Sequence, residues 1–316
     1  MNLLFLLLGL AMILGGAHFL TDGAAAVAQR FRVPEFVIGL TIVAIGTSTP
    51  ELVVSLLSAA GGQSDMAIGN VVGSNLFNVF VIVGICALIR PLPLTAGNIR
   101  RDIPFGLAAA VLLFAMTSDR LLHPGAADRL GRGDGIAMLV LYVGLMLYTI
   151  RSAGRTAPPE AAPARSGPKP WIAVAMIVGG LAALVGGGEL FLKHATAIAR
   201  HLGVSESVIA ITLVAGGTSL PELAASAVSV VKGKTELALG NVVGSNIANI
   251  LLILGTSATI RPLTMGGITP VDTGMVVLSA LLLFVAAFTF RRRTIDRWEG
   301  AIFLAIYAAY MVYLLR

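Results

Sequence analysis

Two glutamates, Glu51 and Glu222, each lie well inside a long run of apolar residues. A carboxylate in such a place is costly unless it is protonated, paired or coordinated, so it marks a functional site by default. No Lys or Arg lies in the four apolar runs around them, which cover residues 37–60, 66–89, 206–231 and 237–260. The expected partner of the two carboxylates is therefore a bound cation.

Hydroxyl and amide side chains accompany each glutamate at intervals of three or four residues, which places them on one face of a helix. The positions are Thr47, Glu51, Ser55 and Ser58, their counterparts Thr218, Glu222, Ser226 and Ser229, and, in the next apolar run of each copy, Asn70, Ser74 and Asn78 with Asn241, Ser245 and Asn249. Carboxylate, amide and hydroxyl oxygens are hard ligands that suit calcium, sodium or magnesium. Zinc or copper would favour His or Cys.

A proline directly precedes each glutamate, at Pro50 and Pro221. A proline inside a helix lacks its own donor and crowds the carbonyl four residues back. The carbonyls around Gly46 and Gly217 are therefore predicted to be freed, and in a broken membrane helix such carbonyls bind cations where they line a cavity.

The elements that must position these residues are membrane helices. The 316 residues are 57% hydrophobic and only 12% charged, whereas about a quarter of residues are charged in soluble domains. This composition excludes an ordinary water-soluble enzyme. All-helical spans follow because lipid offers the backbone no hydrogen-bond partner. Ten candidate spans cover residues 2–21, 37–60, 66–89, 103–118, 134–150, 171–192, 206–231, 237–260, 272–290 and 298–315.

The basic residues behind the net charge of +6 lie in short loops between the apolar runs. Orientation of the chain in the bilayer explains this placement better than nucleic-acid binding does. Successive loops between the ten spans lie on alternate sides of the membrane, and the loops of one side hold 15 of the 22 Lys and Arg residues. By the positive-inside rule that side is cytoplasmic, so both termini are predicted to lie outside a cell (inner) membrane. The segment 152–170 is predicted to be a flexible cytoplasmic linker between two groups of five spans, 1–151 and 171–316.

The two groups contain copies of one segment. Segment 37–92 aligns with 208–263 without a gap, with 30 of 56 positions identical. The identities include Pro, Glu, Asn and Ser, which chance similarity of apolar helices does not produce. Because each group has an odd number of spans, the second copy must enter the membrane from the opposite side. This is the inverted-repeat plan of secondary transporters, whose ion sites lie near the midplane where the repeats meet.

The segments GTSTPEL and GNVVGSNLFN, with GTSLPEL and GNVVGSNIAN, resemble the alpha-1 and alpha-2 repeats of the cation/calcium exchanger superfamily. The chain is most similar to compact prokaryotic sodium/calcium antiporters. The resemblance implies ten transmembrane helices, with helices two, three, seven and eight around central cation sites. It also implies alternating access, in which helices one and six slide across the other helices.

The resemblance implies a set of ligands for transported Ca²⁺ and Na⁺, with no other cofactor. They are Glu51 and Glu222 as the central ligands, oxygens of Thr47, Ser48, Ser74, Thr218, Ser219 and Ser245, the carbonyls of Ala44 and Ala215, and Asn78 with Asn249 at the centre. Some prokaryotic relatives have an aspartate where this chain has Asn249, which leaves the ion stoichiometry open.

The sequence thus predicts an antiporter that exchanges Na⁺ for Ca²⁺ and is not an enzyme. A proton/calcium exchanger of the same superfamily is the nearest alternative, and a cation channel is a more distant one. The expected partners are the two ions and the lipid bilayer. The oligomeric state stays open, with a monomer as one option.

Overall fold

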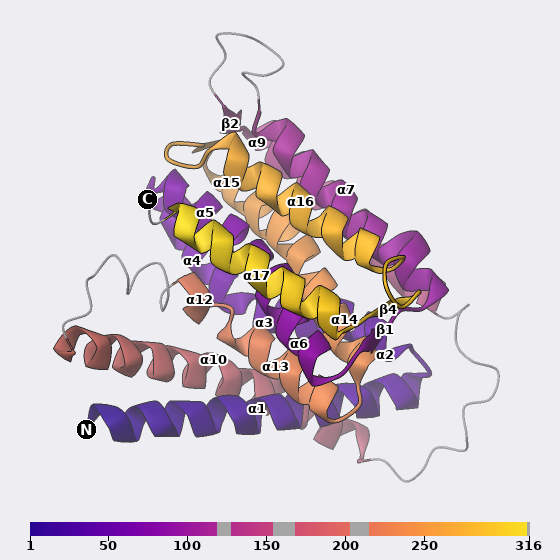
Figure 1. Ribbon diagram of the computed structural model, residues 1–316. Coiled ribbons are helices and arrows are strands. Elements are labelled where there is room, and N and C mark those ends of the chain that lie inside the picture. Colours follow the sequence, from indigo (N-terminus) through magenta and orange to yellow (C-terminus); the bar gives the residue numbers. More distant parts are fainter. Residues whose placement is uncertain (119–127, 154–167, 203–214, 315–316) are drawn as a thin grey trace. The chain divides into compact units, whose positions relative to one another are not determined.

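The computed structural model describes residues 1–118, 128–153, 168–202 and 215–314, which form helices joined by short connections (Figure 1). The helices group into two compact units, each of which takes one segment from the first half of the chain and one from the second half. One comprises Met1–Pro50 with Tyr148–Val242, and the other comprises Glu51–Leu147 with Val243–Arg316.

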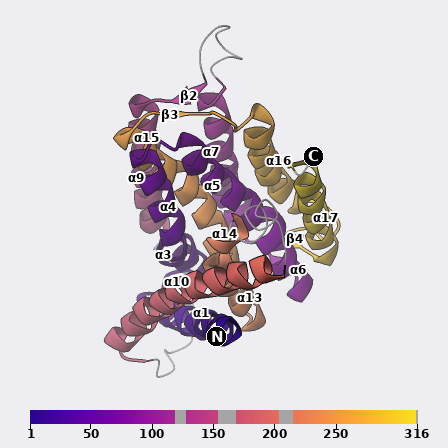
Figure 2. The same ribbon diagram turned by 90° about the vertical axis from the view of Figure 1, so that its left-hand side faces the viewer.

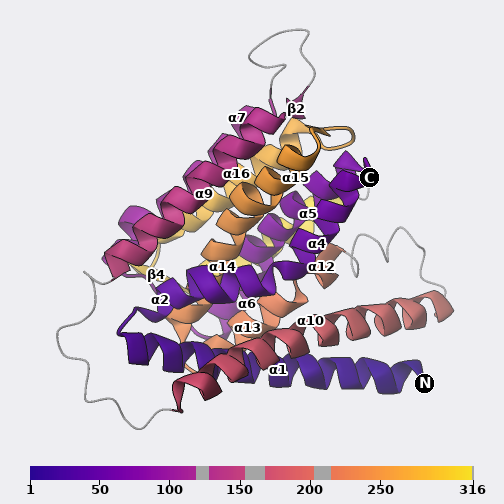
Figure 3. The same cartoon turned by 180° about the vertical axis from the view of Figure 1, so that it is seen from behind.

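The first unit is built on two long helices, α1 (Asn2–Phe31) and α10 (Pro170–His201), which lie side by side and antiparallel (Figures 1 and 3). Glycines bring their backbones together. A Cβ at Gly9 would lie 2.9 Å from the Gly187 carbonyl oxygen, and one at Gly16 would lie 2.7 Å from that of Gly180. Small residues allow this approach in the same way as in other membrane helix pairs.

Helix α13 (Leu220–Val231) packs against α1 in the same unit. The buried hydroxyls of Thr21 and Ser229 lie 3.0 Å apart, and the Lys232 ammonium pairs with Asp22 at 2.7 Å. The remaining elements of the unit are α2 (Glu35–Ile38), the π-helical segment η1 (Gly39–Val43), α3 (Ala44–Thr47), α12 (Ala215–Gly217) and the start of α14 (Thr235–Ile247).

The second unit packs its helices around apolar residues such as Leu113 and Phe80, whose side chains are fully buried. Helix α7 lies against α16, and α17 lies against α6 (Figure 2). The elements are α4 (Thr49–Ala60), α5 (Ser64–Leu76), η2 (Phe77–Val83), α6 (Gly84–Ile89), η3 (Asn98–Asp102), α7 (Ile103–Met116), α9 (Arg132–Ala153), η5 (Ala248–Leu254), α15 (Gly255–Ile260), α16 (Pro270–Ala286) and α17 (Arg297–Leu314).

Two short antiparallel ladders add to the all-helical plan that the sequence predicts. Strand β1 (Leu92–Pro93) pairs with β4 (Thr294–Ile295), and β2 (Arg129–Leu130) pairs with β3 (Leu263–Thr264). Each ladder joins a connection from the first half of the chain to one from the second. They pair backbone groups of the connections next to the helix ends.

The internal repeat is visible in the element boundaries. Helix α5, η2, α6 and β1 correspond to α14, η5, α15 and β3, and each pair begins and ends at equivalent positions of the two aligned copies. The turns after α4 and α13 use Gly62 and Gly233, both at φ 79°, where glycine has no steric penalty. The inverted orientation of the second copy stays a prediction.

Within the described residues, five helices are long and apolar enough to cross a membrane, and a sixth span results if the broken pair Glu35–Thr47 and Thr49–Ala60 counts as one. The predicted span over 206–231 includes residues 206–214, which lie outside the described part. Ten spans therefore remain a prediction, as do the linker over 152–170 and the side of each terminus.

The single cysteine, Cys86 in α6, is 2% exposed.

Candidate ion-binding site

The helix around each glutamate is broken just before the proline. α3 ends at Thr47 and α4 begins at Thr49, while α12 ends at Gly217 and α13 begins at Leu220. Pro50 and Pro221 are therefore the second residues of new helices, where a missing N–H costs little. The structure confirms the predicted disruption of the helix near each proline and places the proline in the first turn of the new helix rather than in a helix interior.

This arrangement puts Glu51 and Glu222 in the first turn of α4 and α13. Both side chains are buried, at 0% and 1% exposure. The first turn carries the positive end of the helix dipole and unpaired N–H groups, which favour a negative charge. The broken helices thus partly compensate each carboxylate without using a Lys or Arg.

In the first unit, Glu222 is contacted by the alpha-1 motif. The Ser48 hydroxyl donates to Glu222 Oε1 at 2.9 Å, and the Thr47 hydroxyl donates to Asn241 Oδ1 at 3.2 Å. The Asn241 amide donates in turn to the Ser226 hydroxyl at 3.0 Å and, at 3.4 Å, to the backbone carbonyl of Glu222. Residues from both motifs therefore hold the segment around Glu222.

In the second unit, Glu51 is contacted by residues of the first copy's next helix, α5. The Ser74 hydroxyl lies 3.4 Å from Glu51 Oε1, and the Asn70 amide donates to the Ser55 hydroxyl at 2.9 Å and to the Glu51 carbonyl at 3.2 Å. The Asn70 and Asn241 bonds are the same contacts at equivalent positions of the two copies. These two asparagines hold the first turns of α4 and α13, and cation ligation by the polar stripes stays a prediction.

Asn78 and Asn249 are the second residues of the π-helical segments η2 and η5. A π-helical turn is wider than an α-helical turn and is frequent at functional sites. Both side chains are 1% exposed. The Asn78 amide nitrogen donates to Asn246 Oδ1 at 3.0 Å, while neither polar atom of the Asn249 side chain has a hydrogen-bond partner among the described residues.

Buried polar atoms without a partner within the described ranges are concentrated at predicted ligands. They include Glu222 Oε2, Thr218 Oγ1, Ser245 Oγ, Asn78 Oδ1 and both amide atoms of Asn249. A few others lie elsewhere, at Asn75, Ser118, Tyr142 and Ser257. Buried polar atoms are normally satisfied, and an ion is one of the explanations for an exception. This pattern fits oxygens that are kept available for a cation.

The other predicted ligands lie at the same helix breaks. Ser48 and Ser219 occupy the breaks and are buried, and Ala215 begins α12. The Ala44 carbonyl accepts from the Ser48 N–H at 3.0 Å and, at 3.4 Å, from the Thr47 hydroxyl. Sequence reasoning missed Asn246 as a partner of Asn78. The signal was present, because Asn75 and Asn246 occupy the same place in both copies of GNVVGSN.

Comparisons with known proteins agree with this arrangement. The family model described as "Sodium/calcium exchanger protein" matches residues 1–151 and 172–316. The sodium/calcium exchanger MaX1 of Methanosarcina acetivorans is 33% identical, over 99% of this chain and 98% of its own length. The inner membrane protein YrbG of Escherichia coli is 34% identical, over 81% of this chain and 79% of its own length.

The fold is also that of a solved exchanger. Structures of the sodium-calcium exchanger NCX_Mj superpose with a TM-score of 0.85 and 29% identity for the protein soaked without Na⁺ and Ca²⁺, over 99% of this chain and 98% of that chain. The protein soaked with Na⁺ and Sr²⁺ gives 0.84 and 30%, over 98% and 97%. These relatives are transporters and not enzymes. Together with the family match over both halves, they establish that this chain belongs to the sodium/calcium exchanger family of membrane proteins.

Proposed function

We propose that this protein is a secondary antiporter that exchanges Na⁺ for Ca²⁺ across the cell membrane by alternating access. The observation that carries the proposal is the set of buried oxygens that have no hydrogen-bond partner within the described part of the chain and that lie at predicted ligand positions, foremost Glu222 Oε2. No ion pair joins Glu222 to a Lys, Arg or His among the described residues. The names of the relatives support calcium as cargo.

Glu51 and Glu222 are the proposed central ligands, because two carboxylates neutralise one Ca²⁺ and hard oxygen ligands suit both ions. Oxygens at and beside the two helix breaks complete the proposed ligand set, from Ala44, Thr47, Ser48, Ala215, Thr218 and Ser219. The facing segments add Ser74, Ser245, Asn78 and Asn249. Sodium competes for the same oxygens and displaces calcium. The protein needs no resident cofactor, since no covalent bond is made or broken.

The proposed topology is ten transmembrane helices in two inverted repeats, 1–151 and 171–316, with both termini outside. The matching element boundaries of the two aligned copies support two copies of one unit. Exposed apolar side chains on α9 support contact with lipid, since Val140, Val143 and Leu147 are 65%, 55% and 47% exposed.

The decisive experiment is calcium-45 uptake into proteoliposomes that contain the purified protein. Vesicles loaded with sodium and diluted into sodium-free buffer are expected to accumulate calcium, because outward sodium flow drives calcium inward. The matched vesicles have equal sodium on both sides and an imposed pH gradient, and are expected to show no uptake above protein-free liposomes.

Uptake driven only by the pH gradient would replace the proposal with proton/calcium exchange. Uptake that needs no counter-ion and does not saturate with calcium concentration would indicate a channel.

A further inference from the structure

Asn78 can serve a cation only if its amide presents the oxygen and not the nitrogen. An amide group carries an acceptor at one corner and two donors at the other, and its neighbours decide which corner faces the site. In the second unit the Asn78 nitrogen donates to Asn246 Oδ1 at 3.0 Å. The Asn78 oxygen is therefore turned away from Asn246, and it has no hydrogen-bond partner among the described residues.

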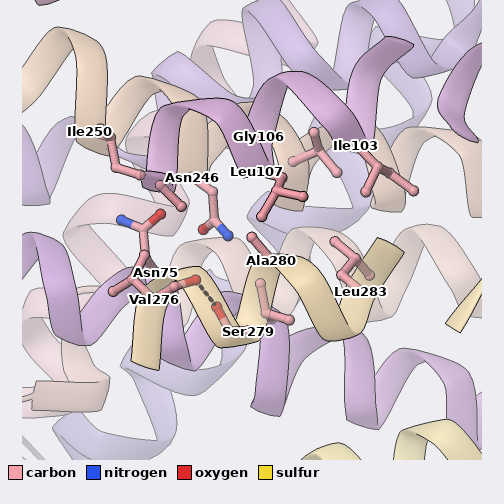
Figure 4. Close-up of a pocket in the computed structure, with 13 residues that line it drawn as sticks. Asn75, Ile103, Gly106, Leu107, Asn246, Ile250, Val276, Ser279, Ala280 and Leu283 are labelled. Carbon is pink, nitrogen blue, oxygen red and sulfur yellow. Dashed lines mark hydrogen bonds between the residues drawn. The ribbon is translucent and has the colours of Figure 1, made fainter. Parts of the chain in front are cut away.

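Asn246 is well placed to be an acceptor. It belongs to α14 and lines a pocket of about 20 Å³ whose other walls come from α5, η2, α7, η5 and α16, together with Asn75, Ser279 and mainly apolar side chains (Figure 4). The two polar neighbours donate within their own helices, since one N–H of the Asn75 amide bonds to the Val71 carbonyl at 2.8 Å and the Ser279 hydroxyl donates to the Val276 carbonyl at 2.8 Å. The donor that the structure gives to the Asn246 oxygen is the Asn78 amide.

The repeat provides an internal comparison. Asn75 is the counterpart of Asn246, and Asn249 is the counterpart of Asn78. Asn75 also points into the pocket (Figure 4), but its amide bonds to its own helix, and Asn249 has no partner on either amide atom among the described residues. Only one of the two central amides is held in place.

We propose that Asn246 is a positioning residue, which fixes the Asn78 amide with its oxygen toward the transported cation and leaves Asn249 free to turn. This inference rests on the proposed function. Asn246 itself does not contact the ion.

The test compares calcium uptake kinetics of three variants in proteoliposomes. Asn246→Leu has a similar shape but removes the acceptor, so the Asn78 amide can turn its nitrogen to the cation. We expect its KM for calcium to rise about three- to tenfold, the value of one hydrogen bond, with the maximal rate within about twofold of wild type. Asn246→Asp keeps an acceptor oxygen and is expected to restore a KM near that of wild type.

Asn75→Leu is the matched control, because it removes an amide from the same pocket at the equivalent repeat position. Its KM is expected to be unchanged. In an Asn78→Ala background, Asn246→Leu should have little further effect, because the group that it orients is gone. Should Asn246→Leu not fold, Asn246→Ala takes its place, since it only removes atoms.

A wild-type KM in Asn246→Leu, an equal rise in Asn75→Leu, or additive effects in the double variant would overturn the positioning role. Stabilisation of the detergent-solubilised protein by Ca²⁺, measured as a shift in Tm, reports binding without transport. A wild type that moves no calcium refutes the proposed function, whereas exchange at unchanged KM in Asn246→Leu refutes only the role of Asn246.

Discussion

Glu51→Gln and Glu222→Gln are each expected to abolish sodium-driven calcium uptake, with a fall of at least about a hundredfold, while the protein still folds in the membrane. Glutamine keeps the shape of the side chain and removes its charge. One remaining carboxylate leaves a bound Ca²⁺ with an uncompensated charge in a poorly solvated place, which is strongly unfavourable. The measurement is calcium-45 uptake, with gel filtration of the solubilised protein to verify folding.

Glu35→Gln is the matched control for these substitutions. Glu35 pairs with Lys234 at 2.6 Å at the start of α2 and is partly exposed, where an ion pair contributes up to about 1 kcal/mol. Its loss should leave uptake close to that of wild type. Normal calcium flux in both Glu51→Gln and Glu222→Gln would refute the assignment of the two glutamates as ligands.

Gly240→Ala is expected to destabilise the protein strongly, and the equivalent Gly69→Ala to be tolerated. A Cβ at Gly240 would overlap the Phe36 carbonyl oxygen, and one at Gly39 would overlap the Leu237 carbonyl, well inside the 3.0 Å that real Cβ atoms respect. A Cβ at Gly69 would instead meet one flexible methyl group of Ile268 at 3.4 Å. The two glycines occupy the same repeat position but have different neighbours.

Overpacking of this kind costs about 1–3 kcal/mol or more, because backbone and not a side chain must move. For a protein of this size we expect Tm of the detergent-solubilised Gly240→Ala protein to fall by about 5–10 °C. The Gly69→Ala protein should melt within about 2 °C of wild type. Equal melting of both variants would show that α14 does not approach η1 and α2 as closely as the structure describes.

The repeat was predictable because identities at Pro, Glu, Asn and Ser are independent of hydropathy. The gapless alignment of the two copies anticipates the boundaries of η5 and α15 from those of η2 and α6. It also anticipates that Asn70 and Asn241 have equal roles, although their serine partners are fixed only by the packing of neighbouring helices.

Other features depend on tertiary contacts that no periodicity reports. The segments around Asn78 and Asn249 form π-helical turns. Their hydrophobic pattern is equally compatible with an α-helix, and packing against neighbouring helices decides between the two helix types. The same holds for the break at Ser48, where proline predicts a disruption but not its exact residue. The bond between Ser48 and Glu222 joins residues 174 positions apart, so only the folded chain reveals it.

The buried position of Cys86 makes the natural chain a ready background for chemical labelling. Its thiol is the single one in the sequence and is 2% exposed, so a bulky, water-soluble maleimide has no accessible native target. A cysteine introduced near either terminus can then be labelled selectively from one side of sealed cells. Reagent that stays outside would modify both termini if they face the periplasm, and the sidedness of every loop can be mapped in the same way, one residue at a time.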